Sequence, residues 1–296
     1  MSRGGDESIY PLEPWALHET RLDLGGLARS ESLFALSNGH IGMRGNLDEG
    51  EPHGLPGTYL NSVYELRPLP YAEAGYGYPE SGQTVINVTN GKLLRLLVDD
   101  EPFDVRYGRL RHHERRLDFR SGTLTREAEW VSPANTAVRI HSERIVSLTQ
   151  RSVAAVRYQV EALDTPLRVV VQSELVANEA LPTLGKDPRT AAVLESPLEC
   201  EEHVADEVGA VMVHRARYSG LRVAAAMRHL VSGVEARVES AATDDVSRLT
   251  VAARLQPGER LELVKLIGYG WSAHRSRPAV HDQVVAALAA ATRRPL

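Results

Sequence analysis

Residues 247–270 read SRLTVAARL-QPGE-RLELVKLIGYG, and this stretch decides the fold class. Two runs rich in apolar residues, 247–255 and 260–270, flank the tetrad Gln256-Pro257-Gly258-Glu259. Pro followed by Gly at the centre of such a tetrad is typical of a type II turn, because Pro presets φ at the second position and Gly accepts a positive φ at the third. The stretch therefore predicts a β-hairpin.

Runs of the same kind recur upstream, separated by short turn signals such as Ser121-Gly122 and Asp164-Thr165-Pro166. Many short strands with turns between them, and no helices alternating with them, indicate an all-β sandwich rather than a βαβ fold. We expect strands at 92–98, in a hairpin over 113–131, and at 136–148, 153–162, 166–176, 191–203, 209–218, 221–231 and 234–240.

Only the C-terminal segment predicts a helix. Residues 278–294 begin with a proline and are rich in alanine, which is a strong helix former. We interpret residues 1–272 as a single large antiparallel β-sandwich domain and residues 273–296 as the start of a helical linker.

Composition excludes several classes of protein. The 296 residues are 43% hydrophobic and 25% charged, and the net charge of −5 offers no basic face for nucleic acid. The basic run at 109–116 is interrupted by histidines and an acid, and we interpret it as a solvated strand and turn. No run approaches the ~20 apolar residues of a membrane helix, and the N-terminus lacks the apolar core of a signal peptide. Cys200 is the only cysteine, which fits a reducing compartment, so we expect a cytoplasmic protein.

The sequence carries no motif for phosphate, metal or nucleophilic chemistry. No P-loop or G-x-S-x-G pattern occurs. His112 and His113 are adjacent, and neighbours on a strand point to opposite faces, so they cannot bind one ion together. Cys200 lies between Glu199 and Glu201, and acidic neighbours raise the pKa of a thiol. The carboxylates are scattered over strands and turns, so no pair suited to glycosidic cleavage can be identified. We expect neither a metal site nor a cofactor.

One block of sequence resembles a known family. Residues 31–45 read ESLFALSNGHIGMRG and fit the pattern E-[ST]-L-F-x-x-x-N-G-x-x-G-x-R-G, with which glycoside hydrolase family 65 opens. That family contains maltose, trehalose, kojibiose and nigerose phosphorylases and some hydrolases. Weaker matches follow in the family's order at 57–59, 96–104, 117–122, 143–148, 154–158 and 173–175. The resemblance covers nearly the whole chain.

The resemblance implies a super-sandwich similar to galactose-mutarotase-like domains, followed by a linker helix, an (α/α)6 catalytic barrel and a small β domain. The barrel carries the general acid and the phosphate site in this family, so no catalytic residue is transferred to this chain. The parent enzyme is expected to be an inverting phosphorylase or hydrolase of an α-glucosidic disaccharide such as trehalose or maltose. Inorganic phosphate is its expected co-substrate, and its own barrel is the expected partner of this domain.

The segment 38–82 interrupts the strand pattern with many glycines, prolines and tyrosines. A segment of this length is usually functional or disordered, and its tyrosines argue against disorder. Because tyrosine rings suit contacts with sugars and with subunits, we take Tyr71, Tyr76 and Tyr78 as candidates for the rim of the substrate site or for a homodimer interface. The alternative is that the segment covers an end of its own sandwich.

Two other functions remain open at this stage. A freestanding carbohydrate-binding module requires an exposed aromatic platform; of the three tryptophans, Trp130 and Trp271 lie in or beside strand runs, where a core role is expected. A complete mutarotase-like enzyme requires a histidine acid facing a glutamate base, for which His141 and Glu174 can be proposed without a supporting motif.

Overall fold

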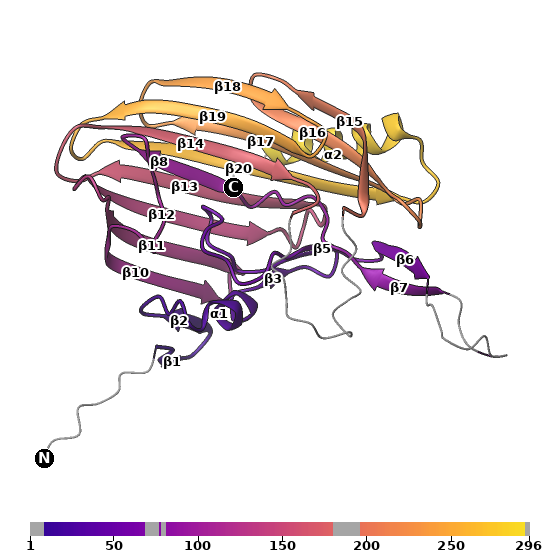
Figure 1. The fold of residues 1–296 in the computed structure, drawn as a ribbon, viewed down its shortest axis with the longest axis horizontal. Coiled ribbons are helices and arrows are strands. Elements are labelled where there is room, and N and C mark those ends of the chain that lie inside the picture. The colour runs from indigo at the N-terminus through magenta and orange to yellow at the C-terminus, as the bar shows by residue number, and fades with distance from the viewer. Residues whose placement is uncertain (1–8, 69–76, 78–80, 180–195, 294–296) are drawn as a thin grey trace, which may run out of the picture.

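A computed structural model of the chain describes residues 9–68, 77, 81–179 and 196–293. Antiparallel strands dominate it (Figure 1), which confirms the predicted all-β sandwich. Among the described residues, no helix is long and apolar enough to cross a membrane.

The largest sheet has ten strands and curves through the whole length of the domain. Neighbouring strands are antiparallel throughout. In spatial order they are β1 (Leu12–Glu13), β2 (Ala16–Glu19), β10 (Arg109–Asp118), β11 (Thr123–Val131), β12 (Ala137–Val146), β13 (Val153–Ala162), β20 (Arg260–Ser272), β17 (Arg222–Ser232), β16 (Gly209–Ala216) and β15 (Leu198–Ala205).

Smaller sheets cover the inner face of this large sheet. The five-stranded sheet packs against its β20–β15 half, whereas the three-stranded sheet and the loop around it lie against β10–β13. The five strands are, in order, β18 (Ala236–Ala242), β19 (Val246–Leu255), β14 (Leu167–Val176), β8 (Leu94–Val98) and β9 (Glu101–Pro102). The other strands are β3 (Leu36–Ser37), β4 (Ile41–Met43) and β5 (Thr58–Leu60), and the separate hairpin of β6 (Tyr64–Pro68) and β7 (Ser81–Val85).

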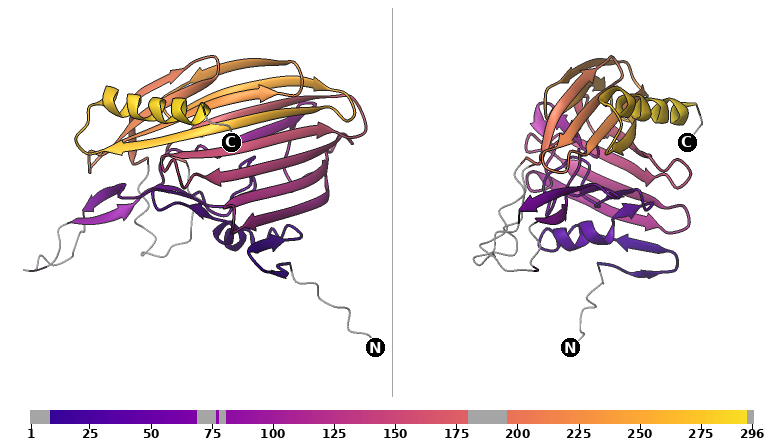
Figure 2. Two further views of the ribbon diagram at one scale, coloured as in Figure 1. Left: turned by 180° about the vertical axis from the view of Figure 1, so that it is seen from behind. Right: turned by 90° about the vertical axis from the view of Figure 1, so that its right-hand side faces the viewer.

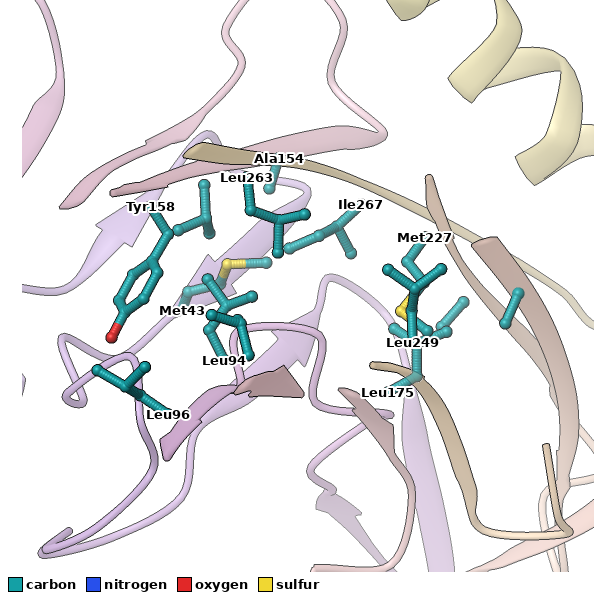
Figure 3. Close-up of a cluster of buried hydrophobic side chains, with 14 of the residues drawn as sticks. Met43, Leu94, Leu96, Ala154, Tyr158, Leu175, Met227, Leu249, Leu263 and Ile267 are labelled. Atoms are coloured by element: carbon teal, nitrogen blue, oxygen red, sulfur yellow. The ribbon is translucent and has the colours of Figure 1, made fainter. Parts of the chain in front are cut away.

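An apolar core fills the space between the layers. Figure 3 shows Tyr158 and Leu263 of the large sheet beside Met43, Leu94 and Leu96 from the covering layer, and all five are buried. Alternate residues of the long strands supply this core, as the period of a strand requires.

Two helices complete the fold, α1 (Leu27–Leu33) and α2 (Arg277–Thr292). Figure 2 shows α2 lying along the outer face of the large sheet, where Val284 and Leu288 are buried. The contact is close because β20 has glycines there: a Cβ on Gly268 would lie 3.0 Å from Leu288 Cγ, and one on Gly270 would lie 3.0 Å from Val284 Cγ1.

Most predicted elements agree with the structure to within a few residues, and the strand over 153–162 agrees at both ends. Of the strand predicted over 191–203, residues 191–195 lie outside the described residues, and the observed strand β15 begins only at Leu198. The stretch at 247–270 forms β19 and β20 with the predicted turn between them, but the prediction of a hairpin was wrong. The two strands do not pair, because β19 pairs with β14 and β18 in the five-stranded sheet and β20 pairs with β13 and β17 in the ten-stranded sheet. Gly258 has φ of +83°, and Glu259 N donates to Gln256 O at 2.9 Å, as a type II turn requires. The helix predicted over 278–294 is α2. Segment 38–82, expected to be irregular, contains the short strands β4 to β6 among its described residues.

Candidate functional site

A row of polar side chains crosses the inner face of the large sheet, where apolar residues are expected. Arg115 of β10 is the register partner of Arg126 of β11, which pairs with Ser142 of β12, which pairs in turn with Tyr158 of β13. Arg144 lies two residues beyond Ser142 on the same face, and all five are buried. Like charges directly opposite each other destabilise a sheet, and a buried charge without a partner is costly. The row therefore requires acids from elsewhere in the chain.

The loop after β4 supplies two of those acids. Glu49 accepts two bonds from Arg126 Nη1, both at 2.9 Å, and a third from the Tyr158 hydroxyl at 2.6 Å. Asp48 accepts a bond from Arg144 and one from the Ser142 hydroxyl at 2.6 Å. Both carboxylates are buried, so the loop is held to the sheet by charge-assisted bonds.

A second set of contacts ties β2 and α1 to the same row. Arg115 Nε donates to Glu19 at 2.7 Å, and its two Nη atoms donate to Gly45 O at 2.8 Å and to the Ser30 hydroxyl at 2.5 Å. The guanidinium lies 4.8 Å from the centre of the Phe34 ring. We call the set Glu19, Ser30, Asp48, Glu49, Arg115, Arg126, Ser142, Arg144 and Tyr158 the ionic network.

The motif at 31–45 builds the support for this network. The Glu31 carboxylate accepts bonds from the backbone N–H groups of Gly54 and Leu55 at 2.8 and 3.1 Å, which fixes the later part of the loop. The Asn38 amide donates to two backbone carbonyls in the turn between β12 and β13, at Ser147 and Arg151. Gly45 is required sterically, because a Cβ there would lie within 2.6–2.9 Å of Phe34 atoms.

The protonation states of Asp48 and His113 suit a structural role of the network rather than proton transfer. Burial alone would raise the pKa of Asp48, but Arg144 and Arg126 overcome this effect and lower it below its ordinary value. Burial, with the adjacent charges of Arg126 and Arg115, holds the pKa of His113 well below its usual value, so the ring is neutral and its Nε2 accepts a bond from Arg126 Nε at 3.3 Å. Asp48 is thus held as a carboxylate against arginines.

Two buried lysines join the layers near this network. Lys92 Nζ donates to Gly57 O and Thr58 Oγ1, at 2.9 and 2.6 Å. Lys265 Nζ donates to the carbonyls of Leu93 and Glu174, at 3.1 and 2.8 Å. Burial lowers the pKa of each lysine to about 7, so their ammonium groups link backbone segments at a cost in desolvation.

The structure separates the two residues proposed for a mutarotase-like reaction. His141 lies on β12 between the inward-facing Ile140 and Ser142, so it points outward, where it contacts Glu127. Glu174 lies on the outward face of β14 in the opposing sheet, and its carboxylate is engaged by Arg95 and Arg248. The pair therefore faces opposite sides of the sandwich and cannot act on one substrate.

The other predicted residues have mixed outcomes. Tyr71, Tyr76 and Tyr78 lie outside the described residues. His112 and His113 do point to opposite faces, as predicted, with His113 buried and His112 exposed. The interpretation of 109–116 as a wholly solvated strand was wrong, because Arg115 is one of the largest fully buried side chains. Trp130 is in the core as predicted, and Trp271 is partly buried against it.

The acids and arginines of the network were not identified from sequence, although a signal existed. In β11, Arg126 has the same parity as the core residues Leu124 and Ala128, and in β12 Arg144 has the same parity as Ile140. An arginine at an inward position of an alternating strand predicts a buried partner of opposite charge. The identity of that partner, about a hundred residues away, is not encoded in the pattern.

Comparison with known proteins places the chain. It is 63% identical over 284 residues to an uncharacterised glycosyl hydrolase of Mycobacterium leprae, covering 95% of this chain and 36% of that protein. It is 29% identical over 275 residues to the α,α-trehalose phosphorylase of Thermoanaerobacter brockii, covering 91% of this chain and 36% of that enzyme. The chain thus spans about a third of the length of these relatives.

Its fold matches a solved structure assigned as a kojibiose phosphorylase from the human microbiome, with a TM-score of 0.84 and 18% identity, over 97% of this chain and 37% of that one. The family model described as glycosyl hydrolase family 65, N-terminal domain, matches residues 17–294. The chain therefore belongs to glycosyl hydrolase family 65, of which it contains the N-terminal domain.

Proposed function

We propose that this chain is the non-catalytic N-terminal domain of an inverting disaccharide phosphorylase or hydrolase that acts on an α-glucosidic disaccharide such as trehalose or maltose. The observation that carries the proposal is the ionic network, in which the buried acids are neutralised by arginines and serve to hold a loop. Its relation to the trehalose phosphorylase, of which it covers only about a third, supports the same division of labour. The chemistry, with inorganic phosphate as co-substrate, is assigned to a C-terminal barrel that packs against this domain.

A glucose-release assay tests this division of labour. The chain is incubated with trehalose, maltose, kojibiose and nigerose, each with and without inorganic phosphate, beside a family 65 phosphorylase as positive control. We expect no release from this chain. Release that depends on phosphate and is lost in Glu49→Gln but kept in Glu129→Gln, which changes a half-buried acid outside the network, would place the chemistry in the network and overturn the proposal.

The tyrosine-rich segment is proposed to contact the barrel rim or a second subunit in a homodimer. In a protein that joins this domain to its barrel, the double variant Tyr76→Ala with Tyr78→Ala, and the single variant Tyr71→Ala, are compared with Tyr107→Ala, an exposed tyrosine outside the segment 38–82. A change in KM or in oligomeric state confined to the first two variants supports the assignment. Unchanged kinetics and mass in all variants would remove it.

A second candidate function, carbohydrate binding, is favoured by one surface feature. Trp15 is 60% exposed and Phe119 is 57% exposed, and the two are joined by a bond from Phe119 N to Trp15 O of 2.8 Å. Arg120 lies 5.3 Å from the Trp15 ring. Exposed aromatic faces bind sugars. If the domain binds carbohydrate at Trp15, titration with trehalose or maltose should quench the tryptophan fluorescence of the unaltered chain and leave that of the Trp15→Ala variant unchanged. No saturable change in the unaltered chain would exclude it.

A further inference from the structure

Three side chains with metal-binding donors meet at one open edge of the sandwich, far from the ionic network in the fold. Cys200 and His203 belong to β15, the last strand of the large sheet, and Asp244 lies in the turn between β18 and β19 of the five-stranded sheet. Their donor atoms all lie within 4.8 Å of one another. The group therefore spans the gap between the two sheets.

A β-bulge makes this meeting possible. On a regular strand, residues three apart point to opposite faces. Here Cys200 pairs with His214 and Glu202 pairs with Val213, so the register of β15 shifts by one residue between them. The extra residue returns His203 to the face of Cys200, as bulges do when they re-aim a side chain.

The distances suit a tetrahedral ion. Zinc bonds of about 2.3 Å to sulfur and about 2.0 Å to nitrogen and oxygen, at tetrahedral angles, separate sulfur from nitrogen by about 3.6 Å and nitrogen from oxygen by about 3.3 Å. In the structure, Cys200 Sγ lies 3.7 Å from His203 Nδ1, which lies 3.4 Å from Asp244 Oδ1. These two separations are therefore close to those of zinc ligands, and the third, between Cys200 and Asp244, lies within 4.8 Å.

The charges around the group favour a cation. The neighbouring acids of β15 are each neutralised by an arginine: Glu199 by Arg217, Glu201 by Arg222 and Glu202 by Arg277. Asp244 has no arginine or lysine partner among the described residues, and its only ion pair there is with His203. A cation placed between Cys200 and Asp244 would therefore balance a carboxylate that no arginine or lysine of the described residues neutralises.

A buried histidine supports the site from behind. His214 lies opposite Cys200 on β16 and is fully buried. Its Nε2 lies 2.9 Å from the carbonyl of Asp244, and because a carbonyl only accepts, Nε2 carries the proton. Its Nδ1 then has a free lone pair and no hydrogen-bond partner in the described part of the chain. This histidine both positions the Asp244 turn and leaves a nitrogen donor on the face of Cys200.

We propose that Cys200 Sγ, His203 Nδ1 and Asp244 Oδ1 bind one Zn²⁺ ion, with a fourth position open to solvent or to a neighbouring side chain. Binding replaces the thiol proton, which is released to solvent, so that the dication is balanced by one thiolate and one carboxylate. The ion would join β15 to the β18–β19 turn and so add a further link between the two sheets at this edge. This proposal departs from the sequence expectation that the chain has no metal site.

The test is metal binding by the chain itself. The chain is stripped with a chelator, dialysed against Zn²⁺ and analysed for metal content, and the variants Cys200→Ser, His203→Ala and Asp244→Asn are treated in parallel. Glu199→Gln is the matched control, since it removes one carboxylate from the same strand. We expect about one Zn²⁺ per chain in the unaltered protein and in the control, and at least tenfold weaker binding in each of the three variants.

A second readout does not depend on how the variants fold. Co²⁺ bound to a thiolate gives an intense near-ultraviolet charge-transfer band, which we expect in the unaltered chain and which Zn²⁺ should bleach. Absence of this band together with absence of bound Zn²⁺ would overturn the proposal. So would Zn²⁺ binding that survives all three ligand substitutions, which would assign the metal to another group, such as the exposed His112, Glu114 and Glu127 on the outer face of the large sheet.

Discussion

Replacing Glu49 by alanine should destabilise the domain far more than an ordinary loss of charge. Its carboxylate is the closest counterion of Arg126, since Asp48 lies 3.7 Å from the same nitrogen, and it is the acceptor of the buried Tyr158 hydroxyl. Removing one partner of a buried ion pair costs about 3–5 kcal/mol. An unsatisfied buried hydroxyl is part of that loss and by itself costs about 1–3 kcal/mol. We therefore expect the free energy of unfolding to fall by about 4 kcal/mol.

Urea denaturation followed by circular dichroism measures this change. The control is Glu129→Ala, which removes a half-buried partner of the solvent-exposed Arg139 side chain at 2.8 Å and should cost about 0.2–1 kcal/mol. In thermal unfolding, the expected loss corresponds to a decrease in Tm of roughly 8–16 °C, at about 2–4 °C per kcal/mol for a domain of this size. If the two variants differ by less than 1 kcal/mol, the network does not stabilise the loop in the way described.

A double variant distinguishes the interaction energy of the Glu49–Arg126 ion pair from the cost of leaving one buried charge unpaired. Glu49→Leu combined with Arg126→Met removes both charges and keeps most of the volume. Because the largest penalty arises from the uncompensated charge, the double variant should be less destabilised than the sum of the single variants by about 1–3 kcal/mol. Strict additivity would mean that the two side chains do not interact energetically.

Three further predictions concern other parts of the molecule. Burial lowers the pKa of His229 to about 3, so between pH 6.5 and 3 protons bind preferentially to the unfolded chain, and the free energy of unfolding falls as the pH is lowered. The variant His229→Gln should reduce this dependence by up to ~1.4 kcal/mol per pH unit. Urea denaturation midpoints at pH 7 and pH 5 measure the difference. Gly45→Ala should cost about 2 kcal/mol or more and lower Tm, whereas Gly42→Ala, whose nearest atom would be 3.9 Å away, should change it little; equal Tm values would contradict the steric reading of the motif. Val284→Ala leaves a cavity beneath α2 and should cost about 1–3 kcal/mol of stability and speed proteolysis of the helix. Val285→Ala, at an exposed position of the same helix, should change the stability by no more than about 0.5 kcal/mol. Similar rates of proteolysis for both variants would show that packing does not hold α2.

The strands and turns could be predicted because their causes are local. The two strands and the turn at 247–270 follow from apolar alternation and a Pro-Gly pair, which are read directly from consecutive residues, whereas the placing of the two strands in different sheets does not. The strand predicted over 153–162 also follows from consecutive residues, and its ends coincide with those of β13. The helix α2 follows from alanine content and an initial proline, although its packing on the outer face of β20 does not.

The two candidate sites could not be predicted because their causes are distant or irregular. Glu49 meets Tyr158 across 109 residues, and Asp48 meets Arg144 across 96, separations at which no spacing rule applies. In a regular strand, Cys200 and His203 would point to opposite faces, and only the bulge after Cys200 brings both side chains to the same face. A register shift of one residue in β15 thus brings together metal-binding side chains whose spacing in the sequence does not predict a site.

The long sequence separations inside the ionic network also bear on the order of folding. The apolar half of the sandwich is assembled largely from hairpins of consecutive strands, such as β16–β17 and β18–β19, whereas the network requires residues 19–49 to close on β10–β13. Closing such distant segments costs chain entropy before any contact compensates for it, so we expect the network to form after the folding transition state. Substitutions within it should then accelerate unfolding and leave the refolding rate nearly unchanged. The network would thus contribute to the kinetic stability of the folded domain, because it slows unfolding without accelerating folding.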